Sequence, residues 1–96
     1  MLYQGCEMEW YADRAESRRV INCDVRIDND FIKVEYVFDG LLTTYSGHSI
    51  GQGHYSLKCV GHPDCTATLH CFENSNRLEG SWQESSTGMW LIKLKK

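Results

Sequence analysis

The chain has 96 residues, of which 42% are hydrophobic and 11% aromatic, with one proline and a formal net charge of −3 at pH 7. This composition is globular and not disordered, and a single domain over residues 1–96 can bury roughly two thirds of its unfolded surface. The negative charge offers no basic field to phosphates, so we expect no nucleic-acid partner.

The sequence predicts a cytoplasmic protein. Residues 1–10 contain no basic stretch, apolar core or small-residue cleavage site, so we expect no secretion signal. No run of about 18 apolar residues occurs, so we expect no membrane-spanning segment. The five cysteines are an odd number, which favours reduced thiols over a disulfide framework.

The first part of the chain allows two interpretations. Residues 6–11 alternate, with Cys6, Met8 and Trp10 on one side of a strand. Residues 7–19 also fit a helical stripe and are rich in helix formers. We favour a strand and a long turn, because the remainder of the chain indicates antiparallel β-structure, and a short helix is the alternative.

Residues 20–28 and 31–39 each alternate between apolar and polar side chains, as half-buried strands do. Asn29-Asp30 lies between them and suits a two-residue hairpin turn. Matching the apolar faces pairs Val25 with Val34 in a self-consistent register. Val20 is expected to face outward, and the residues expected to face inward are Ile21, Cys23, Val25, Ile27, Ile32, Val34, Tyr36 and Phe38.

Asp39-Gly40 is the next turn signal, since both residues tolerate the positive φ of a tight turn. The strand after it places Leu41, Thr43 and Tyr45 on the inward face. Residues 46–53 contain three glycines and are expected to form a loop or a bulged strand.

Residues 51–73 hold three of the five cysteines and three of the four histidines, which raises the question of a metal site. Alternation predicts a hairpin with a loop over residues 62–64. Its apolar faces match when Cys59 lies opposite Ala67, Leu57 opposite Leu69 and Tyr55 opposite Cys71.

This hairpin offers no complete set of metal ligands. Cys59 and Cys71 face inward but lie roughly 13 Å apart along the strands. His54 and His70 face outward as diagonal neighbours at about 7 Å, and they provide only two ligands. The cluster of Cys59, His62 and Cys65 lacks the second ligand pair of a structural zinc motif. We therefore predict no metal site.

Two further strands, over residues 77–84 and 88–94, place Trp82 and Trp90 on the inward face. The whole chain thus predicts an all-β fold: an antiparallel up-and-down meander of about eight strands, closed or nearly closed into a barrel. A barrel of eight strands is either filled by side chains or holds one small ligand.

The segment LEGSWQESSTGMWLIKL, residues 78–94, resembles the closing strands of calycin-type barrels, which include the lipocalin, fatty-acid-binding and avidin-like families. The resemblance implies a meander barrel with a mouth at one end for a small, mainly apolar ligand. Only the architecture carries over, because the lipocalin Gly-x-Trp motif lies on the first strand, whereas Gly80-Ser81-Trp82 comes late in this chain.

No catalytic constellation is recognisable, so we predict neither an enzyme nor a cofactor. No feature places a thiolate beside a cation or at a helix N-terminus, and the carboxylates fall on outward positions and turns. The Gly-rich stretch at residues 47–53 precedes a strand and not a helix, unlike a phosphate-binding loop.

The inward aromatic side chains have two interpretations, a filled core or a lined cavity. We predict a binding module that holds a small, mainly apolar ligand in the mouth of the barrel, with residues 46–53 beside that mouth. The alternative is a homodimer that self-associates through an outer face or an edge, because His54, Val60 and Phe72 face outward. The predicted ligand contacts are Trp10, Tyr36, Tyr45, His48, Gln52, Tyr55, Trp82 and Trp90.

Overall fold

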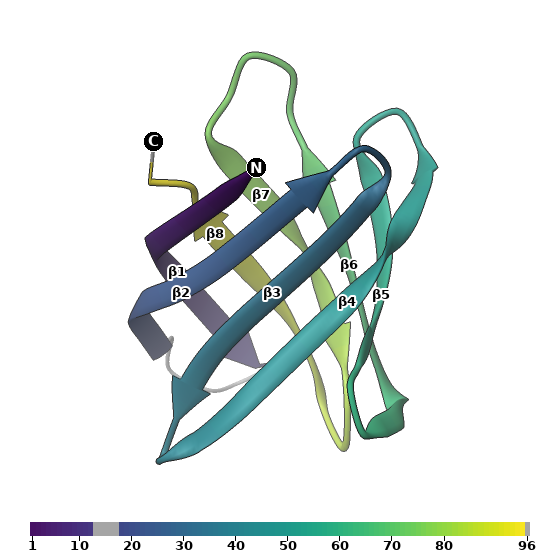
Figure 1. The fold of residues 1–96 in the computed structure, drawn as a ribbon. Coiled ribbons are helices and arrows are strands. Elements are labelled where there is room, and N and C mark those ends of the chain that lie inside the picture. Colours follow the sequence, from purple (N-terminus) through teal and green to yellow (C-terminus); the bar gives the residue numbers. More distant parts are fainter. Residues whose placement is uncertain (13–17, 96) are drawn as a thin grey trace.

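Eight antiparallel strands follow one another around a closed barrel, and the last strand pairs with the first (Figure 1). The structure is a computed structural model that describes residues 1–12 and 18–95. The architecture confirms the predicted all-β, up-and-down meander. The strands are β1 (Leu2–Ala12), β2 (Arg18–Asp28), β3 (Phe31–Phe38), β4 (Leu41–Gly51), β5 (His54–Cys59), β6 (His62–Cys71), β7 (Arg77–Gln83) and β8 (Thr87–Lys93).

The beginning of the chain is a strand, as predicted. β1 runs from Leu2 to Ala12 without interruption, which rules out a helix over residues 7–12, and β2 already begins at Arg18. The part of this prediction that concerns residues 13–17 lies outside the described residues. The described residues contain no helix that could cross a membrane.

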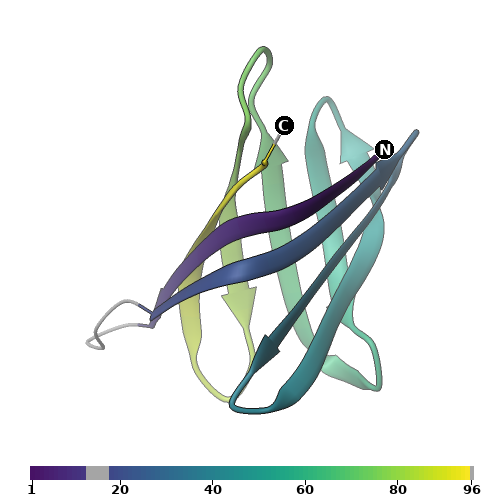
Figure 2. The same cartoon turned by 60° about the vertical axis from the view of Figure 1, so that its left-hand side comes forward.

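The turns between the strands gather at the two ends of the barrel (Figures 1 and 2). One end, the open end, has the turns after β3, β5 and β7. The other, the filled end, has the turns after β2, β4 and β6 together with both chain termini. This division follows from the up-and-down order of the strands, and it decides where the site lies.

The core lies inside the barrel, with contributions from all eight strands. Val25 and Val34 are paired across β2 and β3, as the sequence predicted, and both are fully buried. No polar or charged side chain of the described residues is buried. The buried core consists of Cys6, Met8, Cys23, Val25, Ile32, Val34, Tyr45, Tyr55, Leu57, Ala67, Leu69, Leu78, Trp90, Ile92 and Leu94.

Two predicted orientations at strand ends are wrong. Cys6 pairs with Cys23 but Met8 pairs with Val20, so β2 has one extra residue there, and this bulge brings Val20 against the core. Leu41 was predicted to face inward, but it is 70% exposed because it follows the Asp39-Gly40 turn at the rim. The side chain of Ile21 lies outside the described part of the chain.

The hairpin of β5 and β6 forms with a register two residues away from the predicted one. Leu57 pairs with Ala67 and Tyr55 with Leu69, and the turn is Val60-Gly61 instead of residues 62–64. Gly61 has a φ of +85°, which glycine adopts without strain, and this explains the turn's position. A shift of two residues leaves every side chain on its predicted face.

Candidate ligand-binding site

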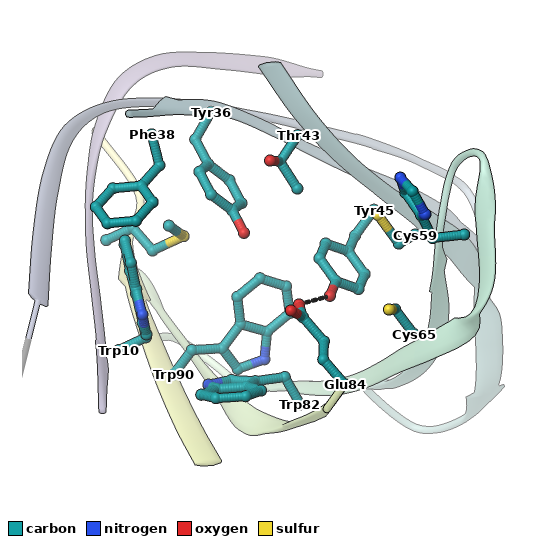
Figure 3. Close-up of a pocket in the computed structure, with 12 residues that line it drawn as sticks. Trp10, Tyr36, Phe38, Thr43, Tyr45, Cys59, Cys65, Trp82, Glu84 and Trp90 are labelled. Atoms are coloured by element: carbon teal, nitrogen blue, oxygen red, sulfur yellow. Dashed lines mark hydrogen bonds between the residues drawn. The ribbon is translucent and has the colours of Figure 1, made fainter. Parts of the chain in front are cut away.

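A cavity of about 370 Å³ opens at the open end of the barrel (Figure 3). Its walls come from side chains of the strands and from Glu84, which directly follows β7. The lining residues are Met8, Trp10, Tyr36, Phe38, Thr43, Tyr45, Cys59, His62, Cys65, Trp82, Glu84 and Trp90.

Aromatic rings make up most of the wall. The Trp10 ring packs against Phe38 in an edge-to-face contact, with ring centroids 4.9 Å apart, and lies 6.0 Å from the Tyr36 ring. Across the cavity, the Tyr45 and Trp90 rings meet at 5.4 Å, also edge to face. Such pairs stabilise one another beyond the area they bury, so the rings support a fixed wall.

Trp90 is held in place by the backbone of β6. Its indole Nε1 donates a hydrogen bond of 2.9 Å to the carbonyl oxygen of Thr68, although β7 lies between β6 and β8. The indole can cross β7 because Gly80, its partner on that strand, has no side chain. A Cβ at Gly80 would lie 1.9 Å from the Thr68 carbonyl oxygen, so β6 and β7 approach closely only because this residue is glycine.

Trp82 is fixed in a similar way. Its Nε1 donates to the carbonyl oxygen of Met89 at 3.2 Å, and its ring lies beside Gly88, where a Cβ would be 2.4 Å from the ring. Both indole N–H groups are therefore satisfied by the backbone. What Trp82 and Trp90 offer to the cavity is apolar ring surface.

Glu84 brings a carboxylate to this aromatic wall. It directly follows β7, and its amide donates to the Ser86 carbonyl oxygen at 2.8 Å within the turn. The Tyr45 hydroxyl donates a hydrogen bond to the Glu84 carboxylate, which points into the cavity (Figure 3). Glu84 is the acidic residue of the described lining, which includes neither lysine nor arginine.

The tyrosine hydroxyls of the cavity remain protonated to high pH. Burial raises the pKa of Tyr45, and the hydrogen bond to Glu84 and its charge raise it further. Burial also raises the pKa of Tyr36, with the charge of Glu84 as the next cause. Both hydroxyls thus lie within the electrostatic field of this carboxylate.

The predicted cysteine and histidine cluster lines one side of the cavity. Cys59, His62 and Cys65 all contribute to the wall, and the two thiols are free. Burial, and next the neighbouring Cys65, raise the pKa of the Cys59 thiol, which favours the protonated thiol over the thiolate. The described residues contain no group of three or more potential ligands that could hold a metal ion.

Five of the eight predicted ligand contacts lie together at the cavity: Trp10, Tyr36, Tyr45, Trp82 and Trp90. The other three do not. Tyr55 is buried in the core near the filled end. His48 is exposed beside Phe31, with ring centroids 5.6 Å apart, and Gln52 lies in the turn between β4 and β5.

Residues 46–53 therefore do not form the mouth, which opens at the opposite end of the barrel. They complete β4, with a bulge after Ser49, and turn into β5. The interpretation of the glycines as a bulged strand is correct, and no residue of this segment lines the described cavity. Glu84 was missed, although Gly80, Trp82 and Glu84 continue one period-two series that the sequence displays.

Comparisons with known proteins found no match to this chain. No protein-family model matches the chain, and neither a curated protein nor a solved structure is significantly similar to it. The eight-stranded antiparallel barrel is consistent with a calycin-like fold. Function is therefore inferred from the chemistry of the site.

Outside the barrel, His54 and His70 are closer than predicted. The altered register places them directly opposite one another, with the two Nδ1 atoms 3.2 Å apart and in a hydrogen bond. Phe72 packs its ring edge against His70. These histidines offer two nitrogen ligands, and the described residues add no third.

Proposed function

We propose that this protein is a binding module that holds a small, mainly apolar ligand in the cavity at the open end. One observation carries the proposal: six aromatic side chains enclose about 370 Å³ and a few polar groups converge on the same space. Ligand sites have this composition, with volumes of about 300 to 1,000 Å³. The cavity is near the lower limit, which suits a compact ligand.

Two further observations support a binding module over an enzyme. The Cys59 thiol has a raised pKa, which disfavours the thiolate that covalent catalysis requires. The resemblance to calycin-type barrels agrees with a mouth at one end of a closed meander. The odd number of cysteines in the sequence favours reduced thiols and a cytoplasmic location.

Self-association is the second candidate function. The barrel is closed, so each of the eight strands has two neighbours and none offers an edge to a second copy. The outer face supports it better: Val37 and Leu42 lie opposite one another on β3 and β4 and are 56% and 66% exposed. Size-exclusion chromatography with light scattering distinguishes a dimer from a monomer.

Intrinsic fluorescence tests the binding function directly. All three tryptophans of the chain line the cavity, so a ligand that enters must alter their emission. We expect a saturable change when small aromatic compounds are titrated into the protein. Native mass spectrometry of protein from its host provides an independent test through a retained ligand.

A matched pair of variants separates binding in the cavity from binding elsewhere. Thr43 lines the cavity, whereas its neighbour Thr44 points the other way, toward Glu35. Thr43→Phe should fill the cavity and abolish the fluorescence response, and Thr44→Phe should leave it intact. A wild-type protein that responds to no compound, or a Thr43→Phe variant that responds fully, would overturn the proposal.

A further inference from the structure

The electrostatic character of the cavity restricts the class of ligand more narrowly than its apolar lining does. Trp and Tyr rings carry negative charge on their faces and attract cations. The Glu84 carboxylate points into the space between these rings. Two independent groups of the wall therefore favour positive charge, and the described lining contains no lysine or arginine that already compensates them.

From this combination we propose that the ligand is an organic cation: a compact amine whose ammonium group contacts Glu84 and the aromatic rings. The inference rests on the proposed binding function and names its ligand class. An ammonium group provides up to three hydrogen-bond donors, and a carboxylate accepts at about four lone-pair sites. Tyr45 occupies one of these sites, so the carboxylate of Glu84 can accept further bonds.

The polarity of the cavity also changes from its rim to its floor, in a way that suits an amine with an apolar body. Glu84 is exposed at the rim, in the turn after β7, whereas Met8 and Trp90 are almost completely buried. Polarity thus decreases from the rim to the floor. An amine would place its charged group at the rim, where solvation is partly retained, and its apolar body against Met8 and Trp90.

The same charges disfavour anionic ligands. A carboxylate in this cavity would lie beside Glu84 and among the electron-rich rings of Trp10, Trp82 and Trp90. Juxtaposed like charges are destabilising, most of all where water is displaced. Fatty acids carry such a carboxylate and therefore do not fit this site.

Three compounds with one apolar body and different head groups test the inference: phenylpropylamine, phenylpropanol and phenylpropionate. At pH about 7 the amine is a cation, the alcohol is neutral and the acid is an anion. We expect the amine to bind at least about tenfold more tightly than the alcohol, a factor that corresponds to about 1.4 kcal/mol. We expect the acid to bind more weakly than the alcohol, as measured by calorimetry and tryptophan fluorescence.

Glu84→Gln removes the charge and keeps the size of the side chain. The amine should then lose its advantage and bind about as tightly as the alcohol, whose own affinity should change little. Glu73→Gln is the matched control, because Glu73 is an exposed carboxylate in the turn after β6, at the filled end. This control changes the net charge equally and should preserve the preference for the amine.

The outcomes distinguish the two proposals. If the alcohol or the acid binds as tightly as the amine, or if Glu84→Gln retains the amine preference, the cation inference is wrong while the binding function stands. If none of the three compounds binds to the wild-type protein, the binding function is overturned and the cation inference with it. A near-ultraviolet circular dichroism spectrum identical to wild type establishes that Glu84→Gln is folded.

Discussion

The two ends of the barrel are built on the same alternation of side chains, yet one is filled and the other is hollow. Aliphatic side chains predominate at the filled end, where Leu69, Leu78 and Ile92 are almost completely buried and Tyr55 adds one ring. At the open end the inward positions carry rings, which pack edge to face and enclose a cavity. The choice of inward residue, and not the strand pattern, separates scaffold from site.

This difference has a simple physical origin. Branched aliphatic side chains interdigitate at close distance and leave few voids inside a barrel of eight strands. Rings that are anchored by their edges, such as Trp82 and Trp90 through their Nε1 atoms, cannot collapse into the space between them. The open end therefore keeps its cavity while the filled end provides the stability.

Truncation of a side chain at the filled end should have the largest effect. Leu78 is fully buried, and Leu78→Ala should lower the free energy of unfolding by about 3 kcal/mol or more, from lost burial and a residual cavity. Thr43→Ala at the open end should cost less than about 1 kcal/mol, since this position already borders empty space. Urea denaturation measures both values, and equal losses would contradict the division of roles.

Gly80→Ala should have the next largest effect on the free energy of unfolding, because β6 and β7 approach closely at this position. The added Cβ would meet the Thr68 carbonyl oxygen at 1.9 Å, force β6 and β7 apart and break the hydrogen bond from Trp90. We expect a loss of about 2 to 3 kcal/mol together with a shift in tryptophan emission. The neighbouring exposed Ser81 is the control, and Ser81→Ala should cost less than about 1 kcal/mol. Unchanged stability of Gly80→Ala would show that the strands can separate freely.

Alkaline pH should lower the free energy of unfolding, first through Cys23 and then through the cavity tyrosines. Burial, and next the charges of Cys6 and Asp24, raise the pKa of Cys23 above its ordinary 9.0. Burial raises the pKa of Tyr36 and Tyr45 above 10.0. Because the folded state retains these protons, the stabilisation is complete below the ordinary value and is lost as the pH rises above it.

Through Cys23 alone, the free energy of unfolding should therefore fall by about 1.4 kcal/mol for each pH unit above 9.0. Cys23→Ala should reduce the slope between pH 9.0 and 10.0 by up to this amount, since the unfolded thiol ionises progressively over this range. Tyr45→Phe should change the slope only above 10.0. Denaturation at a series of pH values measures both slopes, and a flat profile across this range would contradict the assignment.

Most of the fold was predictable because side-chain alternation is a local property. The pairing of Val25 with Val34 and the Asn29-Asp30 turn follow from apolar faces and turn residues alone. The register of β5 and β6 was not predictable in this way. Shifts by two residues preserve the inward set, and only the backbone of Gly61 decides between them.

The site was predictable in part, for a related reason. Alternation identifies which rings face inward, so Trp10, Tyr36 and Trp90 were found, but it does not tell which end of the barrel each ring occupies. The end that a residue occupies follows from the order of the strands, because successive turns lie at alternate ends of the barrel. This order assigns His48 and Gln52 to the filled half and Glu84 to the open rim.

The smallest expected effect is that of metal removal, although the open end collects residues of the ligating kind. Cys59, His62 and Cys65 line one wall, but burial favours the protonated, weakly coordinating form of the Cys59 thiol. The described residues provide no group of three potential ligands. Treatment with a chelator should therefore leave the thermal midpoint and the tryptophan emission unchanged, and protein purified without a histidine tag should contain no stoichiometric zinc. Stoichiometric zinc that disappears in Cys59→Ser or Cys65→Ser would instead make the wall of the cavity a metal site, and the ligand would then have to be one that a metal ion attracts.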